Sequence, residues 1–174
     1  MRGINSSEFD HRLYTGFCAF NEADYLDTVA EDINAIRIEG FGRRVSLVGD
    51  LKAFLSLLRE IRSFKPHVIH THTAKAGFLG RIASIVSLRP AIRVHTFHGH
   101  LLHGYFSPLK TKLVILIEKF LAATSTALIA IGNQVKNDLL AVGVGKPKKY
   151  SVIFPGLEEL NIQSKTSARN ELGL

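Results

Sequence analysis

The chain is poor in cysteine, has no tryptophan and contains no long apolar run, and these shortages limit its class. Cys18 is its one cysteine, so no disulfide can form within the chain, and a reducing cytoplasmic setting is expected. Apolar runs such as 113–117 are far too short to cross a bilayer. Residues 1–11 lack the apolar core of a signal peptide. We therefore expect a cytoplasmic protein with no integral membrane span.

Several catalytic motifs are absent as well. No Gly-x-Ser-x-Gly elbow, Walker-type Gly-x-x-x-x-Gly-Lys-[Ser/Thr] loop or His-Glu-x-x-His helix occurs. Basic residues are not interleaved with aromatic ones in the manner of nucleic-acid-binding modules, so no nucleic-acid partner is expected. These absences leave the histidine-rich segments as the main carriers of chemistry.

The composition is that of a globular domain with an excess of positive charge. The 174 residues are 46% hydrophobic and 21% charged, which suits one ordinary domain with its own core. Lys and Arg number 22 against 15 Asp and Glu, giving a formal net charge of +7, with a local cluster at Lys146, Lys148 and Lys149. Scattered lysines indicate a solvated surface. The alternative is attraction to anionic lipid headgroups or to a phosphorylated substrate.

Helical and strand patterns alternate along the chain and predict an α/β fold. Apolar residues at helical spacing predict helices at 24–34, 50–64, 77–88, 107–123 and 134–142. Short apolar runs predict strands at 12–15, 35–39, 67–71, 92–97, 127–131 and 150–154. This alternation indicates a Rossmann-like parallel sheet with helices on both faces.

Two of the predicted helices carry expectations about which side chains are buried. In the helix at 77–88, the inward residues are expected to be Phe78, Ile82, Ile85 and Val86. The helix at 107–123 carries a wide apolar stripe formed by Leu109, Leu113, Leu116, Ile117, Phe120 and Leu121. We expect this stripe to face the core, with a membrane-surface face as the alternative. Glu118, in the same helix, is expected to be a surface charge.

Polar residues gather where the strand at 67–71 ends. His70 and His72 are two positions apart, so on a strand they point to the same face. Lys75 and Gly77 follow at the turn and could supply a cation and backbone N–H groups at a helix N-terminus, which favours an anion. The alternative is one histidine buried against the backbone and one solvated. In open α/β sheets, this end of the strands is where ligands bind.

A second histidine group follows the strand at 92–97. His95, His98, His100 and His103 raise the hypothesis of a zinc site, as in a zinc-dependent hydrolase. The chain has no cysteine cluster, and its carboxylates lie away from these loops, so we expect no metal. Neutral imidazoles that bind a sugar hydroxyl or a phosphate suit the same positions. Of these residues, His98 is expected nearest the reacting group, because Gly99 beside it lets a ligand approach the backbone closely.

Three segments, 65–81, 95–106 and 149–157, resemble the N-terminal domain of family 4 glycosyltransferases. The resemblance implies the GT-B architecture, in which two Rossmann-like domains face each other across a cleft. It assigns 1–158 to the N-terminal, acceptor-side domain, and 159–174 to a linker and the start of a C-terminal donor domain. It further implies retention of anomeric configuration and no need for a metal or other cofactor. The implied partners are a nucleotide-sugar donor and a saccharide or lipid-linked acceptor, in cell-envelope polysaccharide or glycoconjugate synthesis.

The resemblance also assigns roles to individual residues. The family histidine that matches His98 contacts the donor sugar across the cleft, which makes His98 the expected catalytic residue. The expected substrate-binding residues are His72, Thr73, Lys75, Gly77, Gly99 and His100. The sequence departs from the family at Gly132, where serine is usual.

The resemblance leaves the family's first strand, its Gly-rich loop and its donor domain outside this chain. We therefore expect a fragment truncated at both ends that is inactive alone. The alternative is a non-catalytic binding module or truncated pseudoenzyme that docks on an anionic membrane, at the inner face of the cell membrane, or on a partner domain.

Overall fold

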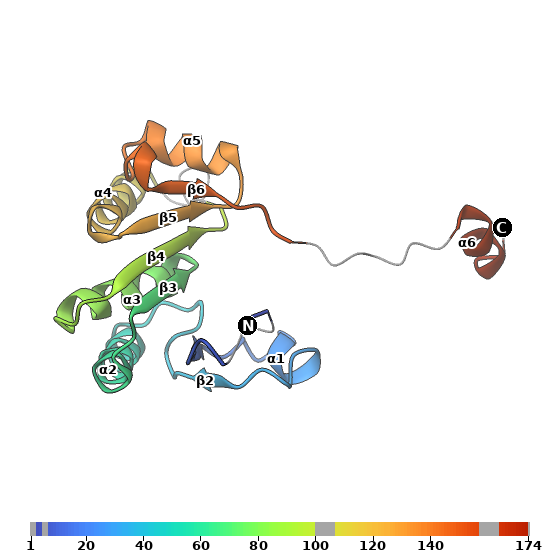
Figure 1. The fold of residues 1–174 in the computed structure, drawn as a ribbon, viewed down its shortest axis with the longest axis horizontal. Coiled ribbons are helices and arrows are strands. Elements are labelled where there is room, and N and C mark those ends of the chain that lie inside the picture. The colour runs from blue at the N-terminus through green and yellow to red at the C-terminus, as the bar shows by residue number, and fades with distance from the viewer. Residues whose placement is uncertain (1–2, 5–6, 100–106, 157–163, 174) are drawn as a thin grey trace.

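The computed structural model describes residues 3–4, 7–99, 107–156 and 164–173, which form an α/β fold (Figure 1). The strands are β1 (Leu13–Thr15), β2 (Ala35–Arg37), β3 (Val68–His72), β4 (Ile92–Phe97), β5 (Ala127–Ala130) and β6 (Tyr150–Val152). The helices are α1 (Tyr25–Thr28), α2 (Leu47–Phe64), α3 (Ala74–Val86), α4 (Pro108–Thr124), α5 (Asn133–Ala141) and α6 (Lys165–Glu171), with a 3-10 turn at Pro147–Lys149. No helix in these ranges is both long enough and apolar enough to span a membrane.

All strand pairs in the described residues are parallel. β1 pairs with β2, while β3, β4, β5 and β6 form a second sheet in that order. The parallel sheets carry helices on both faces, which confirms the predicted Rossmann-like α/β class. Two predictions remain untested: that the family's first strand lies outside this chain, and that the domain boundary follows residue 158.

The start and end of α2 follow from local chemistry. The Ser46 hydroxyl accepts a hydrogen bond from the Gly49 backbone N–H at 3.3 Å, and the Asp50 carboxylate accepts one from the Ser46 N–H at 3.3 Å. Together they satisfy N–H groups that a helix start leaves unpaired, so α2 begins three residues before the predicted Asp50. The helix ends at Lys65, which adopts a left-handed conformation with φ 53° directly before Pro66.

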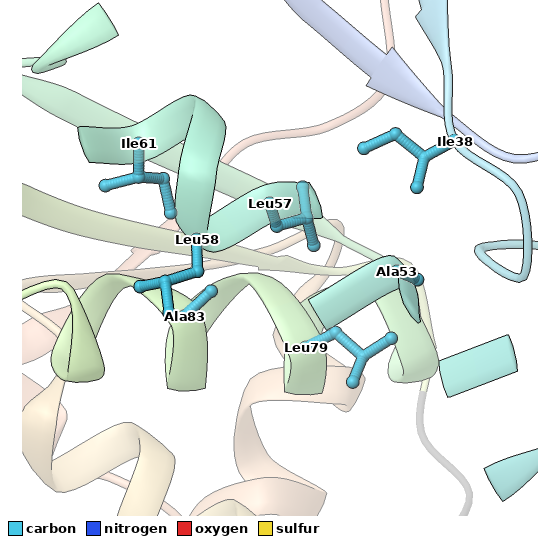
Figure 2. Close-up of a cluster of buried hydrophobic side chains, with 7 residues drawn as sticks. All are labelled: Ile38, Ala53, Leu57, Leu58, Ile61, Leu79 and Ala83. Atoms are coloured by element: carbon cyan, nitrogen blue, oxygen red, sulfur yellow. The ribbon is translucent and has the colours of Figure 1, made fainter. Parts of the chain in front are cut away.

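The first core cluster lies between α2 and α3, and includes Ile38 from the chain beyond β2 (Figure 2). Its buried members are Ile38, Ala53, Leu57, Leu58, Ile61, Leu79 and Ala83. The expectation that Phe78 and Val86 face inward was wrong, because these side chains are 39% and 43% exposed. The side of α3 that meets the sheet carries glycine instead. A Cβ at Gly77 would lie 2.4 Å from His95 Cε1, and one at Gly80 would lie 2.8 Å from Thr71 Cγ2.

The second cluster joins α4 and α5 to strands β4 to β6. Its buried members are Phe97, Ala122, Leu128, Ala130, Leu139, Val144 and Tyr150. Of the apolar stripe predicted for α4, Leu121 is fully buried. Four other members are exposed, so the core expectation was wrong for them: Leu109 at 79%, Leu113 at 57%, Leu116 at 65% and Phe120 at 53%. This exposed set, here called the α4 stripe, follows one side of the helix at spacings of four, three and four residues.

Lys149 is not a freely solvated member of the predicted lysine cluster. Its Nζ donates hydrogen bonds to the carbonyl oxygens of Ala122, Ala123 and Ser125, at 3.0, 2.7 and 2.7 Å. These carbonyls lie at the C-terminal end of α4, where the helix dipole is negative and acceptors lack partners. Lys149 therefore caps α4 and ties it to the chain before β6.

Candidate functional site

The C-terminal ends of β3 and β4, which lie side by side in Figure 1, bring four polar side chains together. Because His72 is in register with Thr96, His98 is its diagonal neighbour two residues further on. The His72 Nδ1 and His98 Nε2 atoms are 2.9 Å apart, which is hydrogen-bond distance. One step back, His70 Nε2 and Thr96 Oγ1 are 2.7 Å apart. The structure therefore joins His72 and His98, which the sequence placed in separate motifs.

The histidine rings of this site also stack on one another. The His70 and His72 ring centroids are 4.3 Å apart, and those of His72 and His98 are 5.2 Å apart. Loss of surrounding water, followed by the like charges of His70 and His98, lowers the pKa of His72 to about 4. Desolvation first and then His98 lower the pKa of His70 as well. Both rings are therefore neutral near pH 7 and bind through hydrogen bonds. The alternative, in which one of these histidines bonds to the backbone, differs from the contacts, because His70 bonds to Thr96 and His72 to His98 through side-chain atoms.

His95 lies on the other face of β4 from this site. It is 2% exposed, and its Nδ1 lies 2.8 Å from the Thr71 hydroxyl, while its ring meets Phe97 edge-on at 4.5 Å. Burial first, and then the charge of Arg81, lower its pKa to about 2. His95 is thus a neutral core residue that cannot share a metal ion with His98. Among the described residues, no group of three or more His, Cys, Asp or Glu side chains is arranged to hold a metal, while His100 and His103 lie outside them.

Lys75 is engaged by protein acceptors. Its Nζ donates to the carbonyl oxygens of Gly40 and Arg44, at 2.7 and 2.6 Å, and pairs with the Asp50 carboxylate at 2.5 Å. The two carbonyl oxygens use two of the three donors of the ammonium group, and Asp50 supplies its counter-charge. The contacts show Lys75 holding the loop before α2 against the start of α3, whereas its predicted contact with a substrate stays a prediction.

The four remaining predicted residues each lie in a different setting. Thr73 precedes α3 with φ 62° and ψ 165°, a conformation that a β-branched residue rarely adopts, and so fixes the turn after His72. Gly99 follows His98 with φ 145° and has open space where a Cβ would stand. Gly77 faces His95 in the helix–sheet interface. His100 lies outside the described residues. Substrate contact by these residues stays a prediction.

Sequence reasoning missed the ion pair between α3 and α4. Arg81 is 1% exposed, and its Nη2 donates to both carboxylate oxygens of Glu118 at 2.8 and 2.9 Å. Its Nε donates to the Gly77 carbonyl at 2.8 Å. The expectation that Glu118 is a surface charge was wrong, because its side chain is only 16% exposed. One signal for this ion pair was present in the sequence: Arg81 follows Gly77 by one helical turn, which puts both on the same side of α3.

Comparison with known proteins assigns the chain to a family. Residues 1–156 match the glycosyl transferase 4-like domain. The chain belongs to the family 4 glycosyltransferases. A relative from Escherichia coli, UDP-Gal:alpha-D-GlcNAc-diphosphoundecaprenol alpha-1,3-galactosyltransferase, is 34% identical over 139 residues, covering 78% of this chain and 34% of the relative. The capsular polysaccharide biosynthesis glycosyltransferase CapM from Staphylococcus aureus is 31% identical over 111 residues, covering 64% of this chain and 29% of the relative. This glycosyltransferase chain thus spans about a third of the length of these relatives.

The fold agrees with the family. A crystal structure of Anabaena Alr3699/HepE, solved in complex with UDP and glucose, superimposes with a TM-score of 0.62 at 18% identity. The match covers 92% of this chain and 42% of that one. The likeness confirms that this glycosyltransferase chain has the Rossmann-like fold of a GT-B half.

Proposed function

We propose that this chain is the acceptor-side half of an enzyme that transfers a sugar from a nucleotide-sugar donor to a saccharide or lipid-linked acceptor, in cell-envelope polysaccharide or glycoconjugate synthesis. The observation that carries the proposal is the His72–His98 contact at the C-terminal ends of two parallel strands, where α/β folds bind ligands. The E. coli and S. aureus relatives support the substrate class. The enzyme acts in the cytoplasm, retains anomeric configuration and needs no metal ion.

In this proposal the chain binds and orients the substrates. The exposed His98 ring hydrogen-bonds the donor sugar, and Gly99 leaves room for it beside the backbone. The first N–H groups of α3, next to His72, present the positive end of a helix dipole to the same edge of the sheet, and this favours phosphate groups. The nucleotide is held mainly by a second domain, so the 174-residue chain alone is inactive.

The first test compares His98→Ala with the parent in a protein where this chain is continued by its donor domain. We expect His98→Ala to lower kcat/KM for sugar transfer by about a hundredfold, the cost of removing one hydrogen bond that stabilises a transition state. The measurement is transfer from radiolabelled nucleotide sugar to a lipid-linked acceptor.

The matched control is His67→Ala, because His67 is an exposed histidine directly before β3, at the opposite end of the sheet's strands from His98, which follows β4. This variant should keep parental activity. Equal activities of His98→Ala and His67→Ala would show that His98 has no role in the reaction. If the parent transfers no sugar from any nucleotide sugar, the proposed function is refuted.

The α4 stripe favours a second function, peripheral contact with an anionic membrane. Lys110, Lys112 and Lys119 are exposed on α4, and its one acidic residue, Glu118, is neutralised by Arg81. An exposed apolar stripe flanked by lysines suits the boundary of a bilayer with anionic headgroups. Such contact suits an enzyme whose acceptor is lipid-linked.

Vesicle binding tests this membrane contact. The variant Leu113→Ser/Leu116→Ser should bind phosphatidylglycerol vesicles about 10–100-fold more weakly than the parent. The reason is that it lacks two leucine side chains that would move from water into the bilayer boundary. The matched control is Leu51→Ser/Leu55→Ser on α2, where the two side chains are 57% and 53% exposed. Co-sedimentation is the measurement. Equal binding of the parent to phosphatidylcholine vesicles, or equal loss in both variants, would contradict a basic docking surface on α4.

A further inference from the structure

The His72–His98 contact restricts the chemistry of both rings. A neutral imidazole has one N–H donor and one lone-pair acceptor, so a hydrogen bond between two ring nitrogens uses the donor of one ring and the acceptor of the other. Since the contact joins His72 Nδ1 to His98 Nε2, the tautomer of one ring fixes that of the other. The free nitrogen of His98 is then always Nδ1.

Within the part of the chain that the structure describes, the contacts of the His98 ring are those with His72. His98 directly follows the last residue of β4, is exposed, and is followed by Gly99, which has open space where a side chain would stand. A ring in this position, if untied, would rotate about its χ2 bond and present either nitrogen. The His72 contact removes that freedom.

His72 is in turn supported from the sheet. Its ring stacks on His70 at 4.3 Å, and His70 bonds the hydroxyl of Thr96, which is 5% exposed. The four side chains thus run from a buried threonine to an exposed histidine along one face of β3 and β4. Strand positions of this kind hold a side chain more firmly than a loop does.

We propose that His72 is the positioning residue for His98: it holds the His98 ring through Nε2 and leaves Nδ1 as the nitrogen that meets the substrate. That Nδ1 meets the substrate rests on the proposed function. The hydrogen bond between the two rings, here called the tie, rests on the structure alone. It assigns His72 a role without direct contact with the reacting atoms.

The electrostatics of the site support this role. The titratable groups that face His72 are His70 on its own strand and His98 after β4. Whenever either ring carries a proton, its positive charge disfavours a further proton on His72. Because desolvation first, and then the charges of His70 and His98, lower the pKa of His72 to about 4, it stays neutral and available as a hydrogen-bond partner near pH 7.

Nitrogen-15 NMR of the imidazole rings tests the tie in the 174-residue chain, with three forms compared. In the parent, the His98 Nε2 signal should carry the shift of a nitrogen hydrogen-bonded to His72 Nδ1, whichever of the two rings donates. In His72→Ala this shift should be lost. In His72→Asn it should return, because the asparagine side-chain amide stands where Nδ1 stood and can donate to Nε2 or accept from it. Unchanged signals from the buried His95 report that each variant is folded. The same His98 Nε2 signal in the parent and in folded His72→Ala would overturn the proposal.

Kinetics in the protein that includes the donor domain provide the second measurement. His72→Ala should lower kcat/KM by about 10–100-fold, as losses of partners that orient a functional histidine do, and His72→Asn should recover most of it. A loss that His72→Asn does not relieve would indicate a purely structural role and overturn the positioning role. The NMR result does not depend on sugar transfer. If the hydrogen bond between the rings is present in a protein that transfers no sugar, the proposed function is contradicted and the hydrogen bond is not.

Discussion

Replacing Glu118 by leucine is expected to destabilise the domain by about 3–5 kcal/mol, because it leaves the Arg81 guanidinium buried without its counter-charge. Arg81 is 1% exposed and meets both carboxylate oxygens of Glu118 within 2.9 Å. At 1% exposure, the guanidinium has little access to water that could take the place of those oxygens. Urea unfolding followed by circular dichroism measures the change in the free energy of unfolding.

Two further variants make this expectation specific. The double variant Arg81→Met/Glu118→Leu removes both charges and should recover most of the lost stability, since apolar replacements of a buried ion pair are often neutral or stabilising. Glu22→Gln breaks an exposed ion pair in which the Arg43 side chain is 91% exposed, and should cost less than about 1 kcal/mol. If the double variant is less stable than Glu118→Leu, Arg81 contributes to the stability of the fold even without its counter-charge, and the expectation is wrong.

Gly77→Ala is the second change with a large expected effect. The new Cβ would lie 2.4 Å from Cε1 of the buried His95, so α3 has to move away from the sheet. Overpacking of this kind costs about 1–3 kcal/mol, even though alanine favours a helix over glycine by about 1 kcal/mol. Thermal and urea unfolding give the difference from the parent.

The control is a glycine in another helix. At Gly49, near the start of α2, the nearest atoms to a Cβ are at 3.4 Å, so Gly49→Ala should be neutral or slightly stabilising. Gly77→Ala combined with His95→Ala should cost little more than His95→Ala alone, because the clash is with that ring. Full additivity of the two changes would show that His95 is not what alanine meets at position 77.

Local sequence chemistry was enough to predict much of the fold. The strand at 92–97 has the predicted bounds, and the helix predicted at 107–123 spans Pro108–Thr124. The predicted helix at 24–34 is limited to Tyr25–Thr28, and the following Asp32 and Asn34 are poor helix formers. The division of the strands into two sheets depends on long-range pairing that no local pattern encodes.

The candidate site was only partly predictable for a related reason. Strand alternation placed His70 and His72 on one face, but the contact with His98 depends on the register of β3 against β4. Hydrophobicity suggested Phe78 as an inward residue of α3, whereas the helix meets the sheet through Gly77 and Gly80, where small size matters more than hydrophobicity. The partner of Arg81 could not be foreseen, because it lies 37 residues away on another helix.

The parallel pairing of every described strand has a consequence for how the chain acquires its structure. Parallel neighbours cannot be joined by a tight hairpin, so each pairing in the larger sheet requires the chain to complete a helical crossover first. The entropy of closing such loops is lost before the strand contacts compensate for it, which slows folding. During synthesis β3 emerges before β4, and it stays without its β4 partner until the whole of α3 and the start of β4 have left the ribosome.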